Sequence, residues 1–367
     1  MEYVCTNCAK KRPVDPALWR CPDCGAIFNL AERRAFSVEA IEKGRSSIWR
    51  YPRSIAVPEG AVPVSMGEGM TPLVPAAFGG KAIHFKLEYL APSGSFKDRG
   101  TSVVVTALRA LGVTRAADDS SGNAGASFAA YAAHAGLRAE VFAPAHASPA
   151  KLAQIEVFGA TLHRIEGPRA KTTEALEAAA QGGLVYASHA WLPFTLEGTK
   201  TVAYEIWEQL DRRASPDGAP DVFVCPIGQG SLFLGAYRGF KDLLAAGLIR
   251  KLPRFIGVQS TGCPPIVEAA RQGLDRAAQI EPQPSVAEGI MLVRPLRDRE
   301  ILQAIRETGG CAVAVPDAET LQARKELARI GLYVEPTSAV VGAALRKLSL
   351  EGTIVAALTG SGLKASA

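Results

Sequence analysis

One lysine stands where its amine could do covalent chemistry. Lys97 lies in the run Ser-Gly-Ser-Phe-Lys-Asp-Arg-Gly (93–100), between a β-like segment and a stretch of helical spacing. A lysine that forms a Schiff base must be desolvated, rigidly placed and partly neutral, and Phe96 supplies an apolar neighbour. Without further signals, Lys97 reads as a surface lysine beside Asp98 and Arg99 at the start of an ordinary helix.

Two loops rich in glycine and serine follow this lysine along the chain. The first, Ser120-Ser121-Gly122-Asn123, leads into a helix expected over 128–134. The second, Gly228-Gln229-Gly230-Ser231-Leu232, follows a strand expected over 221–225 and opens a helix. Main-chain amides at a helix N-terminus bind anions, so the first loop suits a substrate carboxylate and the second a phosphate group. A lone glycine-rich loop is a weak signal, but two of them after such a lysine form a strong one. Ser127, which follows the first loop, is a further substrate-binding candidate.

Four of the seven cysteines lie near the N-terminus and form a metal-binding pattern. Two Cys-x-x-Cys pairs, Cys5 with Cys8 and Cys21 with Cys24, are separated by twelve residues. Each pair turns two sulfurs to one side, and two such turns complete a tetrahedron around zinc. Four thiolates leave no open coordination position, which predicts a structural Zn²⁺ rather than a catalytic one. The alternatives are four unrelated thiols or a redox pair.

The elements expected to position these residues alternate between strand and helix. Short apolar runs such as 83–87, 140–143, 161–165, 221–225, 254–258 and 353–358 alternate with alanine-rich stretches of helical spacing such as 101–111, 150–158 and 171–180. This alternation predicts an α/β architecture with parallel sheets that helices cover on both faces. Ligands bind at the carboxyl ends of the strands in such sheets, and the glycine- and serine-rich loops fall at those ends.

The ordered set of motifs resembles one family of enzymes. The lysine run, the Ser-Ser-Gly-Asn loop, the glycine loop and the run Thr-Gly-Ser-Gly-Leu-Lys (359–364) are similar to the pyridoxal-phosphate (PLP) enzymes of fold type II, the tryptophan synthase β family, and within it to the threonine synthase branch. Further matches lie at 49–51, 68–73, 196–201 and 335–339. The resemblance covers nearly the whole chain, including the cysteine pairs.

This resemblance implies a fold and a role for each site residue. It implies two parallel-sheet α/β domains with the cofactor between them, plus the N-terminal zinc ribbon. Lys97 would hold PLP as a Schiff base and act as the general base, next to Phe96. Asn123 would bond the ring hydroxyl and Thr359 the pyridine nitrogen, while main-chain amides of Gly228, Gln229, Gly230, Ser231 and Leu232 would hold the phosphate. Ser120, Ser121, Gly122 and Ser127 would bind substrate, and Cys5, Cys8, Cys21 and Cys24 would bind zinc.

The expected domains follow the motifs along the chain. Residues 1–35 form the zinc ribbon, and 36–90 form a connector and the start of the large PLP domain. Residues 91–190 form a small α/β substrate domain, and 191–367 the large PLP-binding α/β domain.

The function that the resemblance implies is that of a PLP-dependent carbon–oxygen lyase. Threonine synthase converts O-phospho-L-homoserine and water into L-threonine and phosphate. Two features depart from that pattern: Ala124 stands where a threonine is frequent, and 188–193 lacks an asparagine that helps to bind the substrate phosphate. His189, Lys151 or Arg294 are candidate replacements. A β-replacing synthase, a serine/threonine dehydratase, and an inactive fold whose ribbon serves as an interaction module are the alternatives.

Composition and charge indicate which kinds of molecule the protein binds. Hydrophobic residues make up 48% of the 367 residues and charged residues 21%, and the net charge is +5. The positive charges form no basic cluster, so we expect a small amino-acid substrate and neither nucleic acid nor membrane as partner. The N-terminus does not resemble a signal peptide, which predicts a cytoplasmic protein. The resemblance also implies a homodimer.

Overall fold

The computed structural model describes residues 1–147 and 149–364, and the chain folds into two units. The first unit combines Met1–Glu68 with Lys97–Thr199, and the second combines Gly69–Phe96 with the chain from Lys200 onward. The chain therefore passes from one unit to the other three times, after Glu68, after Phe96 and after Thr199. The domain boundaries expected from the sequence stay a prediction.

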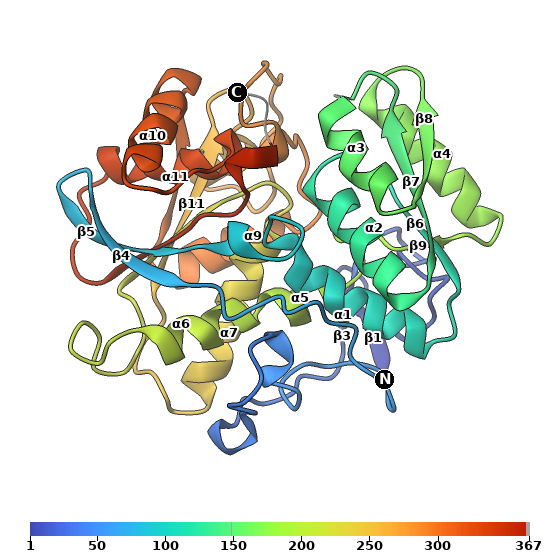
Figure 1. The fold of residues 1–367 in the computed structure, drawn as a ribbon, viewed down its shortest axis with the longest axis horizontal. Coiled ribbons are helices and arrows are strands. Elements are labelled where there is room, and N and C mark those ends of the chain that lie inside the picture. The colour runs from blue at the N-terminus through green and yellow to red at the C-terminus, as the bar shows by residue number, and fades with distance from the viewer. Residues whose placement is uncertain (148, 365–367) are drawn as a thin grey trace. The chain divides into compact units, whose positions relative to one another are not determined.

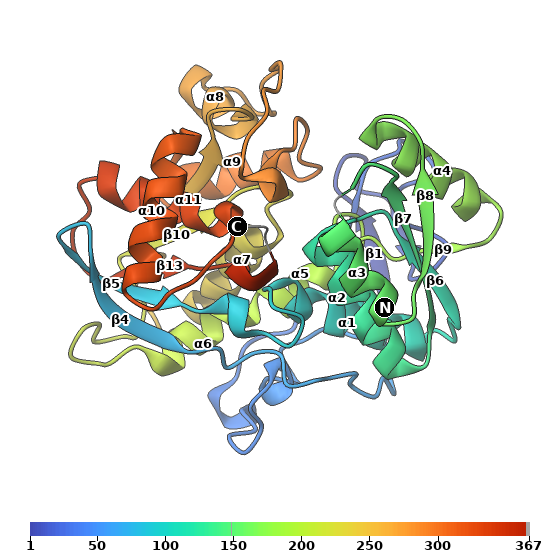
Figure 2. The ribbon, with the colours of Figure 1, turned by 45° about the horizontal axis from the view of Figure 1, so that its top comes forward.

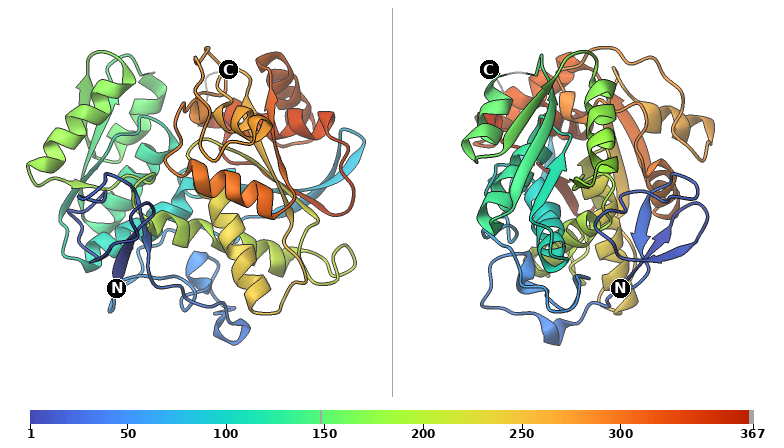
Figure 3. Two further views of the ribbon diagram at one scale, coloured as in Figure 1. Left: turned by 180° about the vertical axis from the view of Figure 1, so that it is seen from behind. Right: turned by 90° about the vertical axis from the view of Figure 1, so that its right-hand side faces the viewer.

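The N-terminal part of the first unit is a small antiparallel sheet, drawn in dark blue in Figure 3. Its strands are β1 (Glu2–Cys5), β2 (Lys11–Pro13) and β3 (Phe28–Leu30), in the order β2-β1-β3. Tyr3 and Phe28 stack with their ring centroids 5.0 Å apart, and both rings are buried. The sheet thus carries a small apolar core beside the cysteine pairs.

The rest of the first unit is an α/β layer structure around a parallel sheet of order β8-β7-β6-β9. Helix α4 lies on one face of this sheet, and α2 and α3 lie on the other (Figure 2). The bounds are β6 (Arg115–Asp118), β7 (Arg138–Pro144), β8 (Thr161–Ile165), β9 (Val185–Tyr186), α1 (Lys97–Ala110), α2 (Asn123–Ala135), α3 (Pro149–Val157), α4 (Arg169–Gln181) and α5 (Phe194–Thr199).

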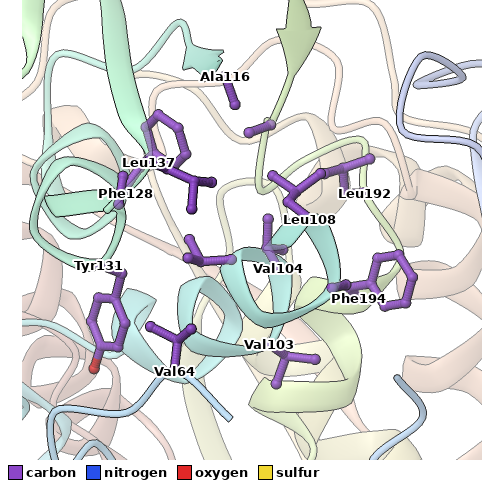
Figure 4. Packing of buried hydrophobic residues seen from close by; sticks show 14 of the residues in the cluster. Val64, Val103, Val104, Leu108, Ala116, Phe128, Tyr131, Leu137, Leu192 and Phe194 are labelled. Carbon is purple, nitrogen blue, oxygen red and sulfur yellow. The ribbon is translucent and has the colours of Figure 1, made fainter. Parts of the chain in front are cut away.

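The apolar faces of α1 and α2 form the centre of this unit. Val104 and Leu108 of α1 lie on the side of the helix that faces Leu192, and Val103 lies on another side of it, as Figure 4 shows. These side chains are almost completely buried, and each buried side chain of this size contributes roughly 1.5–3 kcal/mol. The core therefore fixes the N-termini of both helices, which carry the candidate site residues.

The second unit contains a six-stranded sheet of order β12-β11-β10-β13-β5-β4. Helices α10 and α11 cover one face, and α7, α8 and α9 cover the other (Figures 1 and 3). The bounds are β4 (Leu73–Phe78), β5 (Lys81–Lys86), β10 (Val222–Pro226), β11 (Arg254–Ser260), β12 (Cys311–Val315), β13 (Ile354–Ala357), α6 (Thr201–Gln209), α7 (Ser231–Ala245), α8 (Pro265–Gln272), α9 (Asp298–Glu307), α10 (Asp317–Arg329) and α11 (Pro336–Lys347). Short 3-10 helices span Val38–Ala40, Ile48–Arg50, Glu88–Leu90, Glu288–Ile290 and Gly362–Lys364.

The expected α/β class with parallel sheets is confirmed, and one edge strand departs from the parallel pattern. β4 pairs with β5 in antiparallel register, Phe78 opposite Lys81. Gly79 and Gly80 join the two strands with φ of 58° and 74°. Two left-handed residues form the turn that matches the twist of a tight hairpin, and glycine adopts both without strain.

Within the described residues, no helix is long and apolar enough to cross a membrane.

Candidate active site

Lys97 is the first residue of α1, and its main chain is anchored from α2. The Thr101 hydroxyl donates to the Lys97 carbonyl at 3.0 Å, as is common one turn along a helix. The Ser127 hydroxyl of α2 lies 2.9 Å from Thr101 Oγ1 and donates to Asp98 Oδ1 at 2.6 Å. Asp98 and Ser127 are completely buried, whereas Lys97 is half-buried. The first turn of α1 is thus rigid, while the lysine itself keeps access to the surface.

The loop 120–123 connects β6 to α2, as expected, and Asn123 is the first residue of the helix. The loop residues are half-buried, and the Gly122 amide lies 3.3 Å from Ser120 Oγ. Gly125 permits this path, since a Cβ there would lie 1.8 Å from the Ser120 carbonyl oxygen. The loop therefore approaches the helix closely and leaves main-chain donors at its N-terminus.

Two titratable residues interact electrostatically with Lys97: Asp118, which the sequence analysis did not select, and His189, which it named as a candidate replacement for the missing asparagine. Asp118 ends β6 and is buried; burial first, and then the charge of Asp119, raise its pKa to about 7. The pKa of His189 lies well below its usual value because the ring is desolvated and the charges of Lys97 and Arg169 oppose its protonation. A neutral imidazole and a carboxyl that titrates near neutrality thus lie within electrostatic range of the lysine. In the sequence, Asp118 and Asp119 stand directly before the Ser-Ser-Gly-Asn loop, and this position could have marked Asp118 as a candidate site residue.

The glycine loop of the second unit is closely packed by neighbouring segments. It links β10 to α7, and Gly230 precedes the helix with φ of 77°. A Cβ on Gly230 would lie 2.5 Å from Ile301 Cδ1, and one on Gly228 would lie 3.0 Å from the Gly289 carbonyl oxygen. Gln229 Oε1 accepts from the Leu296 amide at 3.1 Å. The loop is therefore held from both sides, and side chains are excluded where its main chain is most crowded.

Thr359 follows β13 in the same unit. Its amide donates to Ser338 Oγ at 2.8 Å, and its carbonyl accepts from the Phe96 amide at 3.0 Å. Its hydroxyl is buried and has no hydrogen-bond partner among the described residues. A buried hydroxyl of this kind costs free energy unless a further group bonds it, so Thr359 is suited to meet a ligand.

The predicted residues thus form two sets, one in each unit. The first unit brings together Lys97, the loop 120–123 and Ser127, whose hydroxyl is engaged by Asp98 and Thr101. The second unit contains Phe96, the glycine loop 228–232 and Thr359.

The four N-terminal cysteines converge as the spacing predicted. All four sulfurs lie within 4.8 Å of one another, with Cys5 Sγ 3.4 Å from Cys24 Sγ and Cys8 Sγ 3.7 Å from Cys21 Sγ. A tetrahedral zinc with Zn–S bonds of about 2.3 Å places sulfurs roughly 3.8 Å apart, which these distances approach. The amides of Asn7 and Cys8 lie 3.4 Å from Cys5 Sγ and would stabilise a thiolate. The donor set therefore fits a four-thiolate zinc centre.

The two departures from the threonine synthase pattern fall in the first unit. Ala124 is buried at the start of α2, and Leu192 packs into the core that Figure 4 shows. Of the candidate replacements for the missing asparagine, His189 lies near Lys97, whereas Arg294 is exposed in the second unit. The side chain of Lys151 lies outside the described residues.

Comparison with known proteins identifies the class. The family model described as "Pyridoxal-phosphate dependent enzyme" matches residues 64–360, and this chain belongs to that family. Its sequence is 35% identical to the threonine synthase of Methanocaldococcus jannaschii, over 98% of this chain and 92% of that protein. It is 33% identical to the threonine synthase of Methanosarcina acetivorans, over 95% of this chain and 87% of that protein.

Solved structures agree on the fold. A threonine deaminase from T.th. superposes with a TM-score of 0.69 at 25% identity and covers 80% of this chain and 92% of its own. A maize serine racemase superposes with a TM-score of 0.64 at 22% identity, covering 80% of this chain and 88% of its own. The expected fold type II architecture is thereby confirmed.

The residues present fit the cofactor of this family. The buried Thr359 hydroxyl lacks a partner among the described residues, and the glycine loop offers main-chain donors at the start of α7. A side chain at Gly228 or Gly230 would collide with neighbouring atoms. Both features suit a ligand that carries a phosphate and an aromatic nitrogen.

Proposed function

We propose that this chain is a threonine synthase, a PLP-dependent carbon–oxygen lyase that converts O-phospho-L-homoserine and water into L-threonine and phosphate. The observation that carries the proposal is the 35% identity to a threonine synthase over nearly the full length of both chains. The Lys97 run, the loop 120–123, the glycine loop and Thr359 occur in the order of the family that the sequence resembles, and all lie within its matched residues 64–360.

The cofactor, when bound, supplies an electron sink for negative charge that develops next to the amino group. In this proposal Lys97 would hold PLP and, as the general base, would move protons at Cα and Cβ of the substrate. Asn123 bonds the ring hydroxyl, and the main-chain amides of 228–232 hold the cofactor phosphate. Thr359 offers a hydroxyl to the pyridine nitrogen, and Phe96 shields the lysine from water.

Substrate binding is assigned to the loop in front of α2. Ser120, Ser121 and Gly122 orient the substrate carboxylate with main-chain and hydroxyl donors, because these donors lie at a helix N-terminus. Ser127 is assigned to substrate binding as well. Its hydroxyl contacts Asp98 and Thr101 of α1, and this contact helps to hold α2 and the loop in front of it. Cys5, Cys8, Cys21 and Cys24 hold a structural Zn²⁺, supported by the convergence of their sulfurs. We further propose a cytoplasmic homodimer, as the resemblance implies.

The decisive experiment measures phosphate release and amino-acid products together. Purified, PLP-loaded protein is given O-phospho-L-homoserine, and we expect phosphate and threonine in equal amounts. Threonine or serine supplied alone is the control and should give no 2-oxo acid. Loaded protein that releases no phosphate would reject the threonine synthase assignment and leave cofactor binding standing.

A dehydratase of serine or threonine is the second candidate. Two observations favour it: residues 188–193 lack an asparagine for the substrate phosphate, and Leu192 is buried in the core. Its substrate carries a free hydroxyl, so formation of a 2-oxo acid without phosphate separates it from the first candidate. A β-replacing synthase acting on O-phosphoserine would release phosphate and form a new bond at Cβ in place of threonine.

A further inference from the structure

The glycine loop before α7 is held in place by the segment that leads into α9. Gln229 Oε1 accepts a hydrogen bond from the Leu296 amide at 3.1 Å. Ile301, in the first turn of α9, packs against the loop so closely that a Cβ on Gly230 would lie 2.5 Å from its Cδ1 atom. All four residues belong to the second unit. The position of α9 therefore affects where the main chain of the loop lies.

A cluster of three charged side chains ties the start of α9 to α7. Glu300 of α9 accepts a hydrogen bond from Arg238 at 2.6 Å on one carboxylate oxygen and from Arg297 at 2.7 Å on the other. Arg238 belongs to α7, and Arg297 is the residue directly before α9. The two helices also pack against each other (Figure 3). Glu300 thus connects α7, α9 and the segment that contacts the loop.

The cluster is largely shielded from water. The side chains of Arg297, Arg238 and Glu300 are 4%, 17% and 25% exposed. Burial by itself would raise the pKa of Glu300, but the charges of Arg297 and Arg238 lower it to about 2. The carboxylate is therefore ionised throughout the neutral pH range. Hydrogen bonds between charged groups are about twice as strong as neutral ones, so the cluster is a firm attachment point for α9.

Glu300 can influence a phosphate in the loop in two physically distinct ways. As a negative charge it opposes the binding of a phosphate, because like charges repel each other. As the attachment point of α9 it favours binding, because it keeps the main-chain donors of the loop in one arrangement before the phosphate arrives. A neutral glutamine at this position removes the charge and weakens the attachment. The two effects therefore predict opposite changes in phosphate affinity.

We propose that Glu300 is a positioning residue for the cofactor phosphate. It fixes the first turn of α9, and this turn in turn holds Gln229 and Gly230, so that the amides at the start of α7 keep the orientation in which they bind an anion. The inference rests on the proposed cofactor site and extends it to a residue of a different helix.

The test compares the binding of PLP with that of pyridoxal, which has the same ring and aldehyde but no phosphate. The full chain, freed of cofactor, is titrated with each compound, and the visible absorbance gives the two dissociation constants. We expect Glu300→Gln to bind PLP roughly tenfold more weakly than the wild type does. Its affinity for pyridoxal should be unchanged, because that compound does not use the loop amides. A general loosening of the fold would weaken the binding of both compounds alike.

Glu307→Gln is the matched control. Glu307 is the last residue of α9, and it accepts hydrogen bonds from Tyr237 of α7 and from Gln303 and pairs with Lys241 of α7 at 3.4 Å. It thus joins the same two helices at the end of α9 that lies away from Leu296 and Ile301. Both dissociation constants should keep their wild-type values in this variant.

A second variant follows the route of the effect. Gln229→Met removes the acceptor of the Leu296 amide and should also weaken the binding of PLP without affecting pyridoxal. If Glu300 acts through this contact, the double variant Glu300→Gln/Gln229→Met should bind PLP no more weakly than the weaker single variant does. Arg238→Met breaks the same attachment from the side of α7. It should give the same results and replaces Glu300→Gln if that variant does not fold.

Three outcomes would overturn the proposal. Tighter binding of PLP by Glu300→Gln would mean that the residue acts through its charge alone. A ratio of the two dissociation constants equal to that of the wild type would mean that Glu300 has no specific effect on the phosphate. Fully additive losses in the double variant would exclude the route through Gln229. Wild-type protein that binds neither compound would instead contradict the proposed cofactor site itself.

Discussion

At the scale of single residues, the proposal depends first on Lys97. Replacing it by alanine removes both the covalent link to the cofactor and the general base, and general-base catalysis alone contributes about 10²–10⁴-fold. We expect Lys97→Ala to lose its visible absorbance on dialysis and to lose at least 10³-fold in kcat. Its melting temperature without cofactor should stay close to that of the wild type, because Lys97 is half-buried.

Lys171→Ala is the matched control for this substitution. Lys171 lies in the same unit, is exposed, and forms an ion pair with Glu174 at 2.9 Å. Exposed pairs of this kind contribute 0–1 kcal/mol, so activity and absorbance should be unchanged. Lys97→Ala protein that keeps its kcat would remove Lys97 from the mechanism.

Asp118 should also leave a signature in the pH dependence of stability. Its pKa is about 7 in the folded protein and near 3.8 as an unperturbed group, so between these values the folded state binds the proton more tightly. Its contribution to stability is fully present below pH 3.8 and is lost as pH rises through 7.

Asp118→Asn should remove this loss. Relative to the wild type, the variant gains free energy of unfolding between pH 5 and pH 8, by roughly 1–3 kcal/mol. Urea unfolding of both proteins without cofactor at a series of pH values measures this difference. A constant difference across that range would show that Asp118 does not titrate there.

Residues whose type and spacing define their chemistry could be identified from the sequence, whereas a residue whose property depends on its surroundings in space could not. Lys97 and the cysteines were predictable because covalent and metal chemistry require fixed residue types at fixed spacing. Asp118 was not, since its property comes from burial and from its neighbours in space: Asp119, Lys97 and Arg169. His189 was named from the sequence as a candidate replacement for the missing asparagine, but its neutrality comes from burial and nearby positive charge, which the sequence does not show.

At the scale of elements, the glycine loop before α7 gives a sharp test. Gly230 has φ of 77°, and an added Cβ would lie 2.5 Å from Ile301 Cδ1. Gly230→Ala therefore combines left-handed strain of about 1–2 kcal/mol with a steric clash. We expect a loss of roughly 2–4 kcal/mol in stability and at least tenfold weaker binding of PLP.

Gly247→Ala isolates the first of these two effects. Gly247 follows α7 with φ of 70°, and an added Cβ would meet nothing within 4 Å. It should cost only the strain, about 1–2 kcal/mol, and leave PLP affinity unchanged. Chemical denaturation and cofactor titration of both variants make the comparison; similar PLP affinities would show that the loop tolerates a side chain.

Most elements were predictable where their periodicity was strong. The segment 161–165 is a strand with the expected bounds, and helices were expected and found around 101–111 and 171–180. The parallel strands β6 and β12 were not selected, because the four residues of β6 contain only two apolar ones, and β12 is a short run of mostly small side chains. The antiparallel strand β4 was not predicted either, although the pair Gly79-Gly80 between two apolar runs is typical of a hairpin turn.

At the scale of the whole molecule, the N-terminal ribbon, for which we propose a bound zinc, packs against other parts of the first unit. Trp19 of the ribbon lies 5.1 Å from the ring of Tyr186 and 4.8 Å from that of Trp191, measured between centroids. Tyr3 contacts Phe194 at 6.3 Å. All three contacts fall on the segment 186–194, which also carries His189.

Loss of zinc should therefore loosen a segment remote from the metal in sequence. A ribbon this small has little core of its own and depends on its metal to fold, so Trp19 and Tyr3 would leave their partners when zinc is lost. Cys24→Ser removes one ligand at an exposed position and so costs no core packing. We expect this variant to retain less than one zinc per chain and to exchange its amide hydrogens in 186–194 at least tenfold faster.

The control is Cys311→Ser, which changes a half-buried thiol of the second unit and leaves the four-sulfur cluster intact. It should keep its zinc and the protection of 186–194. Strand β11 of the second unit should be equally protected in all three proteins, because its neighbours are β10 and β12. If Cys24→Ser loses zinc while exchange in 186–194 stays at the wild-type rate, the aromatic contacts of the ribbon do not hold that segment. The metal would then stabilise the ribbon alone.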